Sequence, residues 1–492
     1  MIIRVRSKEG TARVEIDETS TLLDLYKKIS SQLGIPQFIL TQSPTGGAPL
    51  GANNLTIKSM NFKNGDMLYL TNTSQDNNTN NTSNQQQNEA QPEEDEIDKQ
   101  LAKKDGWVQR NRDPQLCHHG THGKCSWCMP IPPWAIREYD PWKKEGVKYI
   151  SFHGYLRKLQ SGIQSDKRPI DPPSYRVKDC SKHPPWPEGI CTECKPAPAR
   201  IDAQTYRHVD YVQMESFELV DKFIQFWRET GLQRCGYLYG KYIPDENIPL
   251  GICASVEAVY EPPQKNSPED FTLEKDPNED KVDALAAQLG LTRIGFIWTD
   301  LAVDPKTRKP VKNRDVALYP AECLRMAKMQ NKYPNVCRAS TTNYCGSKFV
   351  GVCVTGNQFG EVELQPYQVS DQLMSLVRDG LISSKAKQVD MLRIRHSKKQ
   401  FIPDVTYRGK DEYNNEVIKK AEPGVPIEFF ILPIRHGAPK TPKPLLPSVQ
   451  FPIENRMTAQ QTAVAVKQIF DKFKIAGLKD FHLLVYMGLN TE

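Results

Sequence analysis

Two short clusters of cysteine and histidine constrain this chain more than any other feature. The first runs from Cys117 to Cys128 and the second from Cys180 to Cys194, and each ends in a Cys-x2-Cys pair. Such a pair presents two sulfurs from one tight turn, so a neighbouring loop must supply the other two corners of a zinc tetrahedron. Both clusters offer that loop. The sequence therefore predicts two structural Zn²⁺ ions, each held by three cysteines and one histidine.

The spacing settles the ligands of the second cluster but not of the first. The predicted ligands of the second are Cys180, His183, Cys191 and Cys194. In the first, three histidines compete beside Cys117, Cys125 and Cys128, namely His118, His119 and His122. Four protein ligands leave no position for water, so both sites are expected to be structural and closed. Free thiols or a redox Cys-x-x-Cys pair are the alternative, which the repeated arrangement disfavours.

Length and composition limit the class of protein. A chain of 492 residues exceeds what one core usually supports, so several domains are expected. The net charge of +6 is small for this length, and we find no block of Lys and Arg that would indicate nucleic-acid binding. The sequence contains no uninterrupted apolar run of about 18 residues, so we expect no membrane span, and we expect no signal peptide at its start. Twelve cysteines then favour the reducing cytoplasm and nucleus.

The first hundred residues divide into a small domain and a tether. Residues 1–70 show two strand-like runs, IIRVRS and ARVEID, followed by a helical pattern that begins after Thr21 and a last strand after NGD. Thr21 with Asp24 three residues later is typical of a helix N-terminus. This order predicts a ubiquitin-like β-grasp domain. Residues 71–104 are rich in Asn, Gln and Glu and predict a disordered linker, in which the acidic stretch 93–98 is solvated.

The rest of the chain predicts a multidomain α+β protein. Residues 105–204 form the zinc region, residues 205–380 an α/β domain and residues 381–492 a C-terminal domain. MESFELVDKFIQFWRETG, DKVDALAAQLG and PAECLRMAKMQ predict helices, while CGYLYG, ICASVEAVY, IGFIWTD and KFVGVCVTG predict strands. Near the end we expect a helix at 462–473 and a strand at FHLLVYM. The cysteines inside apolar strands are predicted to be core residues, and the isolated histidines are predicted to be hydrogen-bonded core or surface residues rather than catalytic ones.

Several motifs resemble the nuclear protein localization protein 4 family. LCHHGTHGKCSWCMPIPPW, SFHGYLRKL and CSKHPPWPEGICTEC are similar to its paired zinc fingers, and QPYQVSDQLMSLVRDG, FIPDVTY, FPIENR and DFHLLVYM extend the likeness toward the C-terminus. The resemblance covers about 105–492 by motif, and 1–70 by the order of elements only. It implies that His119 is the histidine ligand of the first site.

The α/β domain resembles the MPN domain, whose active members are zinc isopeptidases acting on ubiquitin. Their activity needs a Glu base before a Gly-x-Leu-x-Gly strand and two metal-binding histidines in a His-Ser-His strand. Aligned to those motifs, this chain has Gln233, Trp298 and Asp300. An amide cannot serve as the base, and an indole cannot bind zinc. The resemblance therefore implies an inactive MPN domain without catalytic residues, and a deubiquitinating enzyme is the disfavoured alternative.

The resemblance also implies partners. The family acts as a non-catalytic adaptor that delivers polyubiquitinated proteins, including an unfolded ubiquitin, to a hexameric valosin-containing-protein type AAA ATPase, together with ubiquitin fusion degradation protein 1. On that interpretation the protein is cytoplasmic and nuclear and is recruited to the surface of the endoplasmic reticulum or nuclear envelope. We expect the apolar tips Pro132-Pro133-Trp134 and Pro184-Pro185-Trp186 to be exposed and to contact the ATPase ring, with packing over their own zinc sites as the alternative.

Overall fold

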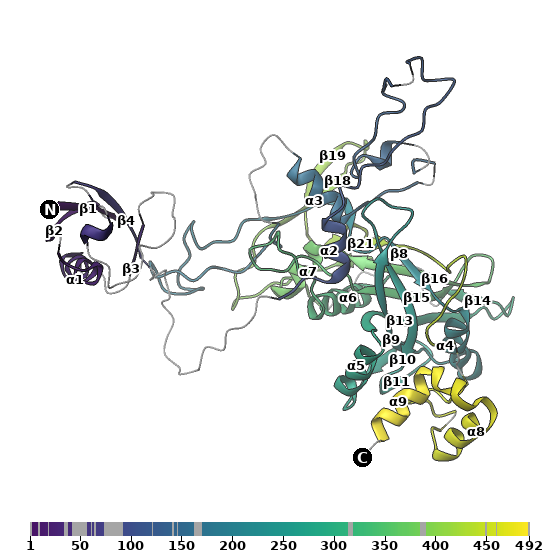
Figure 1. Cartoon of the computed structure of the whole chain (residues 1–492). Coiled ribbons are helices and arrows are strands. Elements are labelled where there is room, and N and C mark those ends of the chain that lie inside the picture. Colours follow the sequence, from purple (N-terminus) through teal and green to yellow (C-terminus); the bar gives the residue numbers. More distant parts are fainter. Residues whose placement is uncertain are drawn as a thin grey trace. The chain divides into compact units, whose positions relative to one another are not determined.

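The computed structural model describes most of the chain as two separate compact units. The described residues are 2–7, 10–17, 19–33, 38–41, 57–60, 62, 65–72, 92–120, 122–139, 142–144, 146–161, 170–312, 318–383, 390–447, 450–458 and 460–490. The first unit covers Met1–Ala90 and the second Gln91–Glu492. Figure 1 draws both units. Most of the predicted linker, 73–91, lies outside the described residues.

The first unit is a ubiquitin-like β-grasp domain. Its four strands lie in the order β2-β1-β4-β3, with β1 antiparallel to β2 and parallel to β4. Their alternating apolar side chains meet the inner face of α1 in one core, which includes Val5, Leu25, Ile29 and Leu68. The elements are β1 Ile2–Ser7, β2 Gly10–Glu15, α1 Leu22–Leu33, β3 Phe38–Thr41 and β4 Met67–Asn72, with a 3-10 turn at Ile57–Met60.

Thr21 and Asp24 close the N-terminus of α1 as predicted. The backbone N–H of Asp24 donates to the Thr21 hydroxyl at 3.3 Å, and that of Thr21 donates to the Asp24 carboxylate at 3.0 Å. These reciprocal bonds satisfy donors that the first turn leaves without intrahelical partners. The Thr21 hydroxyl also donates to the Asp24 carboxylate at 2.7 Å, and this bond, followed by that of the Thr21 N–H, lowers the pKa of Asp24.

The second unit is built on one large mixed sheet. Its strands lie in the order β21-β16-β15-β13-β9-β10-β8-β22, and β14 pairs with β13 off this path. The predicted apolar runs form its centre. The strands are β8 Tyr211–Met214, β9 Cys235–Pro244, β10 Ile252–Tyr260, β13 Thr292–Val303, β14 Pro310–Lys312, β15 Val350–Gly356, β16 Val362–Val369, β21 Ile431–Pro433 and β22 Arg435–Gly437.

The segment 431–437 reaches both ends of this sheet. Its first part, β21, pairs antiparallel with β16, and its second part, β22, pairs parallel with β8. Ile434 between them donates its N–H to the carbonyl of Pro366 at 2.9 Å. The predicted boundary at 380/381 therefore does not separate two sheets, because the C-terminal segment completes the sheet of the central domain.

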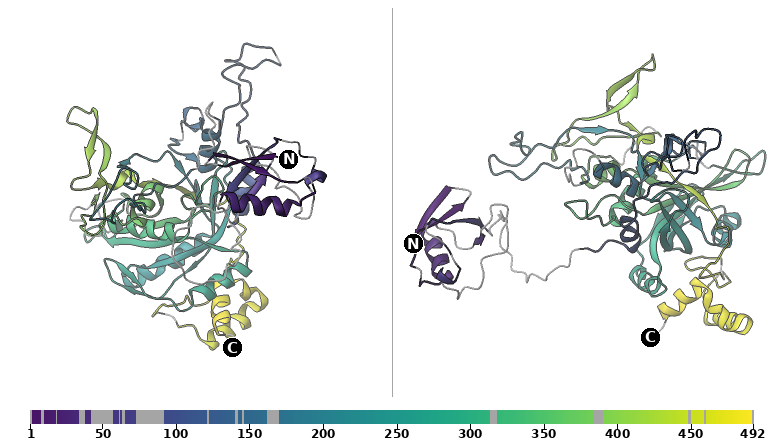
Figure 2. Two further views of the ribbon diagram at one scale, coloured as in Figure 1. Left: turned by 90° about the vertical axis from the view of Figure 1, so that its left-hand side faces the viewer. Right: turned by 45° about the horizontal axis from the view of Figure 1, so that its top comes forward.

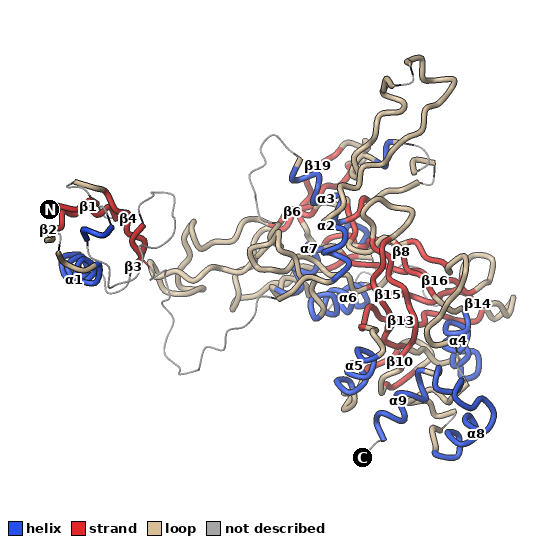
Figure 3. Tube along the Cα trace, viewed as in Figure 1, coloured by secondary structure: helices blue, strands red, loops and turns tan. Residues whose placement is uncertain are grey.

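Helices cover both faces of the large sheet. On one face α4 packs over the central strands in a core with Phe223, Trp227 and Ile297, and on the other α6 and α7 pack in a core with Trp298. Ile297 and Trp298 take opposite sides because side chains alternate along a strand. Figure 3 distinguishes these helices in blue from the strands in red. The helices are α4 Phe217–Thr230, α5 Glu279–Gln288, α6 Pro320–Lys332 and α7 Asp371–Arg378.

Residues 96–102 form a helix, so the predicted linker is wrong over this range. Helix α2, Glu96–Ala102, packs Ile97 and Leu101 into the core on the α4 side of the sheet. Its Asp98 is 4% exposed and binds both His153 Nε2, at 2.8 Å, and the ammonium of Lys348. His153 lies in helix α3, Phe152–Gln160. A buried ion cluster with residues distant in sequence therefore orders an acidic segment that composition alone presents as solvated.

The C-terminal prediction of a strand at FHLLVYM is also wrong. These residues begin helix α9, Phe481–Asn490, which follows α8, Ala463–Phe473, and a 3-10 turn at Lys474–Lys479. Asp480 is fully buried and accepts the backbone N–H groups of His482 and Leu483, which fixes the first turn of α9. Figure 1 draws α8 and α9 in yellow at one end of the unit.

Buried ion pairs attach this helical end to the sheet. Glu261, directly after β10, binds Arg234 at 2.6 Å and Arg456 at 2.5 Å. Glu454 accepts the backbone N–H of Glu261 at 2.8 Å and pairs with His482 at 2.7 Å. The FPIENR motif thus anchors the helical end to the sheet, because its Glu454 pairs with His482 and its Arg456 with Glu261 away from water.

Smaller sheets complete the second unit. A hairpin of β18 and β19 extends by parallel pairing with β6, and Figure 2 (right) shows it as a projecting green ribbon. No described helix is long and apolar enough to cross a membrane. The remaining strands are β5 Ile150–Ser151, β6 Ala199–Ile201, β7 Tyr206–Arg207, β11 Gln264–Asn266, β12 Phe271–Leu273, β17 Met391–Leu392, β18 Val405–Lys410, β19 Glu416–Lys420 and β20 Val425–Pro426.

Candidate metal sites

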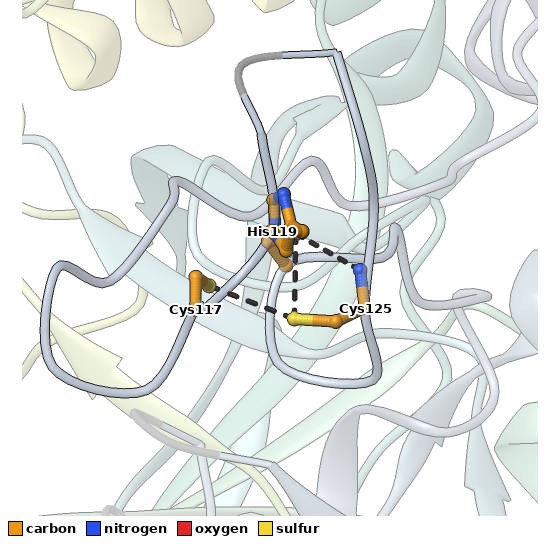
Figure 4. A group of neighbouring side chains, drawn as sticks. Cys117, His119 and Cys125 are labelled. Atoms are coloured by element: carbon orange, nitrogen blue, oxygen red, sulfur yellow. Dashed lines mark hydrogen bonds between the residues drawn. The ribbon is translucent and has the colours of Figure 1, made fainter.

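The first cluster brings four predicted ligands to one point. Cys117, His119, Cys125 and Cys128 each offer one donor atom, and these atoms lie within 4.8 Å of one another. Figure 4 shows Cys117, His119 and Cys125 converging from successive turns of the loop. The competing residues His118 and His122 are exposed and do not belong to this group.

The second cluster repeats the arrangement. Cys180, His183, Cys191 and Cys194 also lie within 4.8 Å of one another by their donor atoms. Both Cys-x2-Cys turns close in the same way, because the residue after the second cysteine donates its N–H to the carbonyl of the first. The N–O distances are 2.8 Å for Met129 to Cys125 and 2.9 Å for Lys195 to Cys191. Figure 3 draws both segments almost wholly as loop.

The sulfur spacing fits a tetrahedral zinc site. Zn–S bonds of about 2.3 Å at tetrahedral corners place two sulfurs about 3.8 Å apart. The Sγ of Cys125 lies 3.7 Å from that of Cys117 and 3.8 Å from that of Cys128. In the second site the Sγ of Cys191 lies 3.8 Å from that of Cys180 and 3.6 Å from that of Cys194. A disulfide would need about 2.05 Å, so these are thiols grouped as metal ligands are.

Each histidine is oriented by a backbone carbonyl. The Nδ1 of His119 lies 2.8 Å from the carbonyl of Gly120, and the Nδ1 of His183 lies 2.7 Å from that of Pro184. A carbonyl only accepts, so Nδ1 carries the proton and Nε2 keeps its lone pair. That Nε2 lies 3.1 Å from Cys128 Sγ in the first site and 3.2 Å from Cys194 Sγ in the second. Histidines that bind metal typically donate their other ring N–H to a backbone carbonyl in this way.

Backbone donors favour the thiolate form in both turns. The N–H groups of Cys194 and Glu193 lower the pKa of Cys191 to about 6. In the first site burial acts in the opposite direction, but the N–H groups of Trp127 and Cys128 still lower the pKa of Cys125 to about 6. Because zinc binds thiolates, each turn supplies a ligand that is already deprotonated near neutral pH.

Arg110 supports the first turn, and sequence reasoning missed it. Its Nε donates to the carbonyl of Met129 at 2.7 Å, its Nη2 donates to that of Ser126, and its guanidinium lies 4.9 Å from the ring centre of Tyr139. The guanidinium therefore holds two carbonyls of the Cys-x2-Cys turn. No spacing rule marks an arginine that lies 15 residues before Cys125 as its support.

The predicted exposed tips are only partly exposed. Pro133 is buried, and Trp134 is half-buried in a cluster with Ile136 and Ile248. Trp186 is half-buried and meets the ring of Phe401 edge-on at 5.2 Å. The prediction fails at these tryptophans because each has a partner in the folded unit that lies far away in sequence.

Other apolar side chains are exposed at the first site instead. Trp127 and Met129, inside and directly after its Cys-x2-Cys turn, are 55% and 52% exposed. The Met129 backbone bonds the Cys125 carbonyl and Arg110, and the Trp127 N–H bonds the Cys125 sulfur, while both side chains face solvent. A rigid loop that exposes a tryptophan is typical of a protein contact surface.

The positions equivalent to an isopeptidase centre are filled by buried structural groups. Gln233 is 1% exposed and bonds the carbonyls of Pro268, at 2.8 Å, and Leu301, at 2.7 Å. Trp298 is 2% exposed and donates its Nε1–H to Glu322 at 3.1 Å. Asp300 is also buried. These side chains join the strands and α6, and among the described residues only the two Cys/His clusters group metal ligands closely.

The scattered histidines divide between core and surface, since His153, His208 and His482 are buried and His396 and His436 are exposed, while the cysteines inside the strands occupy core positions as predicted. His208 lies 3.0 Å from the Asp371 carboxylate, which also accepts the Tyr206 hydroxyl at 2.8 Å. Cys235 and Cys353 are at most 1% exposed inside their strands. Burial raises the pKa of Cys235 well above its usual value, so this thiol is not an activated nucleophile.

Comparison with known families covers nearly the whole chain. Family models match residues 1–71 (nuclear pore localisation protein NPL4), 92–231 (NPL4 family, zinc-binding region) and 234–491 (NPL4 family). The Homo sapiens nuclear protein localization protein 4 homolog is 37% identical over 100% of this chain and 84% of its own length. The Drosophila melanogaster homolog is 36% identical over 99% of this chain and 79% of its own length. The Saccharomyces cerevisiae nuclear protein localization protein 4 is 32% identical over 98% of this chain and 90% of its own length.

Fold and sites together define a class of multidomain protein. It joins a ubiquitin-like domain to a zinc-binding region of two Cys3His clusters, and that region to an MPN-like domain. The chain belongs to the nuclear protein localization protein 4 (NPL4) family, as the matches and full-length relatives show.

Proposed function

We propose that the chain is a non-catalytic ubiquitin adaptor of a hexameric valosin-containing-protein type AAA ATPase. In this role it works with ubiquitin fusion degradation protein 1 and brings polyubiquitinated proteins, including an unfolded ubiquitin, to the ATPase for unfolding. The observation that carries the proposal is membership of the NPL4 family over the whole chain. The protein would act in the cytoplasm and nucleus and at the surface of the endoplasmic reticulum or nuclear envelope.

Two structural Zn²⁺ ions fit the residues present. Cys117, His119, Cys125 and Cys128 would hold one, and Cys180, His183, Cys191 and Cys194 the other. When bound, each ion would stabilise its loop by roughly 10 kcal/mol, which is most of the local folding free energy. The chain's own contribution is the oriented imidazole and the backbone donors that favour the thiolate.

Structural hydrogen bonds support the non-catalytic part of the proposal. A metalloisopeptidase needs a carboxylate base and an open metal position. The amide of Gln233 is committed to two backbone carbonyls, and the indole of Trp298 to Glu322. Native mass spectrometry of the full chain should find two zinc ions, and incubation with di-ubiquitin should release no monomer. A third ion, or cleavage, would favour the isopeptidase alternative.

The first metal site offers a contact surface for the ATPase. Trp127 and Met129 are exposed on a loop whose backbone is fixed by hydrogen bonds and by Arg110. A fixed loop loses little conformational entropy on binding, so exposed apolar side chains there gain affinity at low cost. We expect these two residues, rather than the buried tip at 132–134, to contact the ring.

Binding to the purified ATPase hexamer tests this surface. Replacing Trp127 and Met129 by Ala should weaken binding at least tenfold and leave two zinc ions bound. Phe217 and Ile475, which are 64% and 81% exposed elsewhere in the unit, provide a matched alanine control that should bind normally. Equal affinity of both double variants and the wild type would refute the assignment of the surface.

A further inference from the structure

A pocket lies where the second metal site meets the C-terminal segment. Its volume is about 590 Å³, within the range of ordinary ligand sites. Trp186 and Phe401 meet edge-on in its wall, and the buried side chains of Ile394, Val405 and Ala421 add apolar surface. The pocket thus joins an aromatic corner to an apolar floor.

Cations outnumber carboxylates around this pocket. Arg395, Lys398 and Lys420 line it and are exposed, and they form no ion pair with another described residue. Lys195 adds a fourth cation, with its Nζ 5.6 Å from the ring centre of Phe401. Asp404 and Glu422 are the two acidic lining residues. The balance is positive, so the pocket favours an anionic occupant.

The basic residues belong to a run that the sequence analysis overlooked. The segment RIRHSKK, 393–399, carries four cations besides His396, although we expected no Lys and Arg block in the chain. The run is short; Ile394 within it and Leu392 just before it are buried, while its four cationic side chains and His396 are exposed.

An unpaired indole donor marks the same corner. The Nε1–H of Trp186 is buried and has no hydrogen-bond acceptor among the described residues. A buried donor without a partner is destabilising, so an acceptor supplied from outside would be favoured. A carboxylate or carbonyl that binds in the pocket beside Trp186 would provide such an acceptor.

We propose that this pocket binds an extended acidic peptide that inserts one large apolar side chain between Trp186 and the apolar floor. Aspartate and glutamate residues on either side of that side chain pair with Arg395, Lys398 and Lys420. A nucleic acid fits less well, because Asp404 and Glu422 repel phosphates and the cations surround one compact pocket rather than a long stripe. The site is separate from the surface at Trp127 and Met129, and its test needs no ATPase.

Fluorescence anisotropy of the full-length chain with a labelled peptide, Asp-Glu-Asp-Phe-Glu-Asp-Glu, tests the proposal. The peptide should bind, and its affinity should fall with added salt. Two comparison peptides, one with Gly in place of Phe and one with Asn and Gln in place of the acids, should each bind at least tenfold more weakly. If the peptide with Gly in place of Phe binds as tightly as the labelled peptide, binding depends on charge alone and the proposed pocket is overturned.

Matched charge reversals complete the test. Arg395→Glu with Lys398→Glu should weaken the acidic peptide at least tenfold, while Lys275→Glu with Lys281→Glu, which changes the net charge equally at exposed residues outside the pocket, should leave it unchanged. Both variants should keep two zinc ions. Equal affinity for the peptide in all three proteins would overturn the site, and so would displacement of the peptide by an oligouridine RNA, which would assign the pocket to nucleic acid.

Discussion

Removing the charge of Asp98 should detach helix α2 from the sheet. Asp98 is 4% exposed and faces the Lys348 ammonium, which is itself 5% exposed, and the His153 ring at 2.8 Å. Loss of one partner from a buried ion pair destabilises by about 3–5 kcal/mol, because the other charge stays buried. Lys348 still pairs with Asp95 at 2.5 Å in this variant. Because the Asp95 side chain is 54% exposed, this ion pair stabilises by at most about 1 kcal/mol. For Asp98→Asn we therefore expect a loss of about 2–4 kcal/mol in the free energy of local opening.

Hydrogen exchange of the full-length chain measures this opening directly. Amides of α2 should exchange roughly 30- to 800-fold faster in Asp98→Asn, since each 1.36 kcal/mol is a factor of ten. Asp95→Asn, the exposed member of the same cluster, should change exchange by less than about fivefold. Amides of α5, which lies away from this cluster, serve as an internal standard in each variant.

A double-mutant cycle identifies the cause. Lys348→Met alone should destabilise α2 because it leaves a buried carboxylate, and combined with Asp98→Asn it should cost less than the sum of the two changes. We expect a coupling of about 2 kcal/mol between these contacting residues. Strict additivity, or unchanged exchange in Asp98→Asn, would refute the view that this ion pair orders α2.

Three further predictions concern the metal sites and the C-terminal helices. His119→Ala should reduce bound zinc from two ions to one by native mass spectrometry, while His118→Ala should keep both. The Glu454–His482 pair predicts a dependence on pH: although burial opposes both charges, each partner favours the other, so the pKa of His482 is raised above 6.5 and that of Glu454 is lowered below 4.5. The stabilisation is complete between about these values and is lost as pH rises through the raised pKa of His482; chemical denaturation should therefore show the difference between wild type and His482→Asn shrinking from pH 6 to pH 9, and a constant difference would contradict it. Thr462→Ala removes the hydroxyl that accepts the Ala465 N–H at 3.2 Å and should destabilise α8 by about 1 kcal/mol, as measured by hydrogen exchange.

Local signals predicted those elements that local contacts fix. Helix α4 shows its apolar face in the sequence, and Ser216 and Gly231 close its two ends, with a backbone φ of +70° at Gly231 that suits a residue without a side chain. The central strands were equally predictable, because short apolar runs between polar segments are typical of buried strands. The grouping of cysteines into two clusters was predictable for the same reason.

Long-range contacts decided the elements that were missed. Helix α2 has only Ile97 and Leu101 as apolar anchors, and its order depends on Lys348, 250 residues away. The run FHLLVYM is as apolar as a strand, and only the buried carboxylate of Asp480 shows that a helix begins there. In the first metal site, spacing could not choose among three histidines, because the choice depends on how the loop folds back onto the carbonyl of Gly120.

The closure of the large sheet by residues 431–437 has a consequence for synthesis. Until this segment leaves the ribosome, β16 and β8 each present an open backbone edge, and both edges are filled by one stretch of seven residues. Open edges recruit other chains. During synthesis the edges of β16 and β8 can therefore both pair wrongly with other chains. Both edges become protected in one late step, when residues 431–437 bind to them.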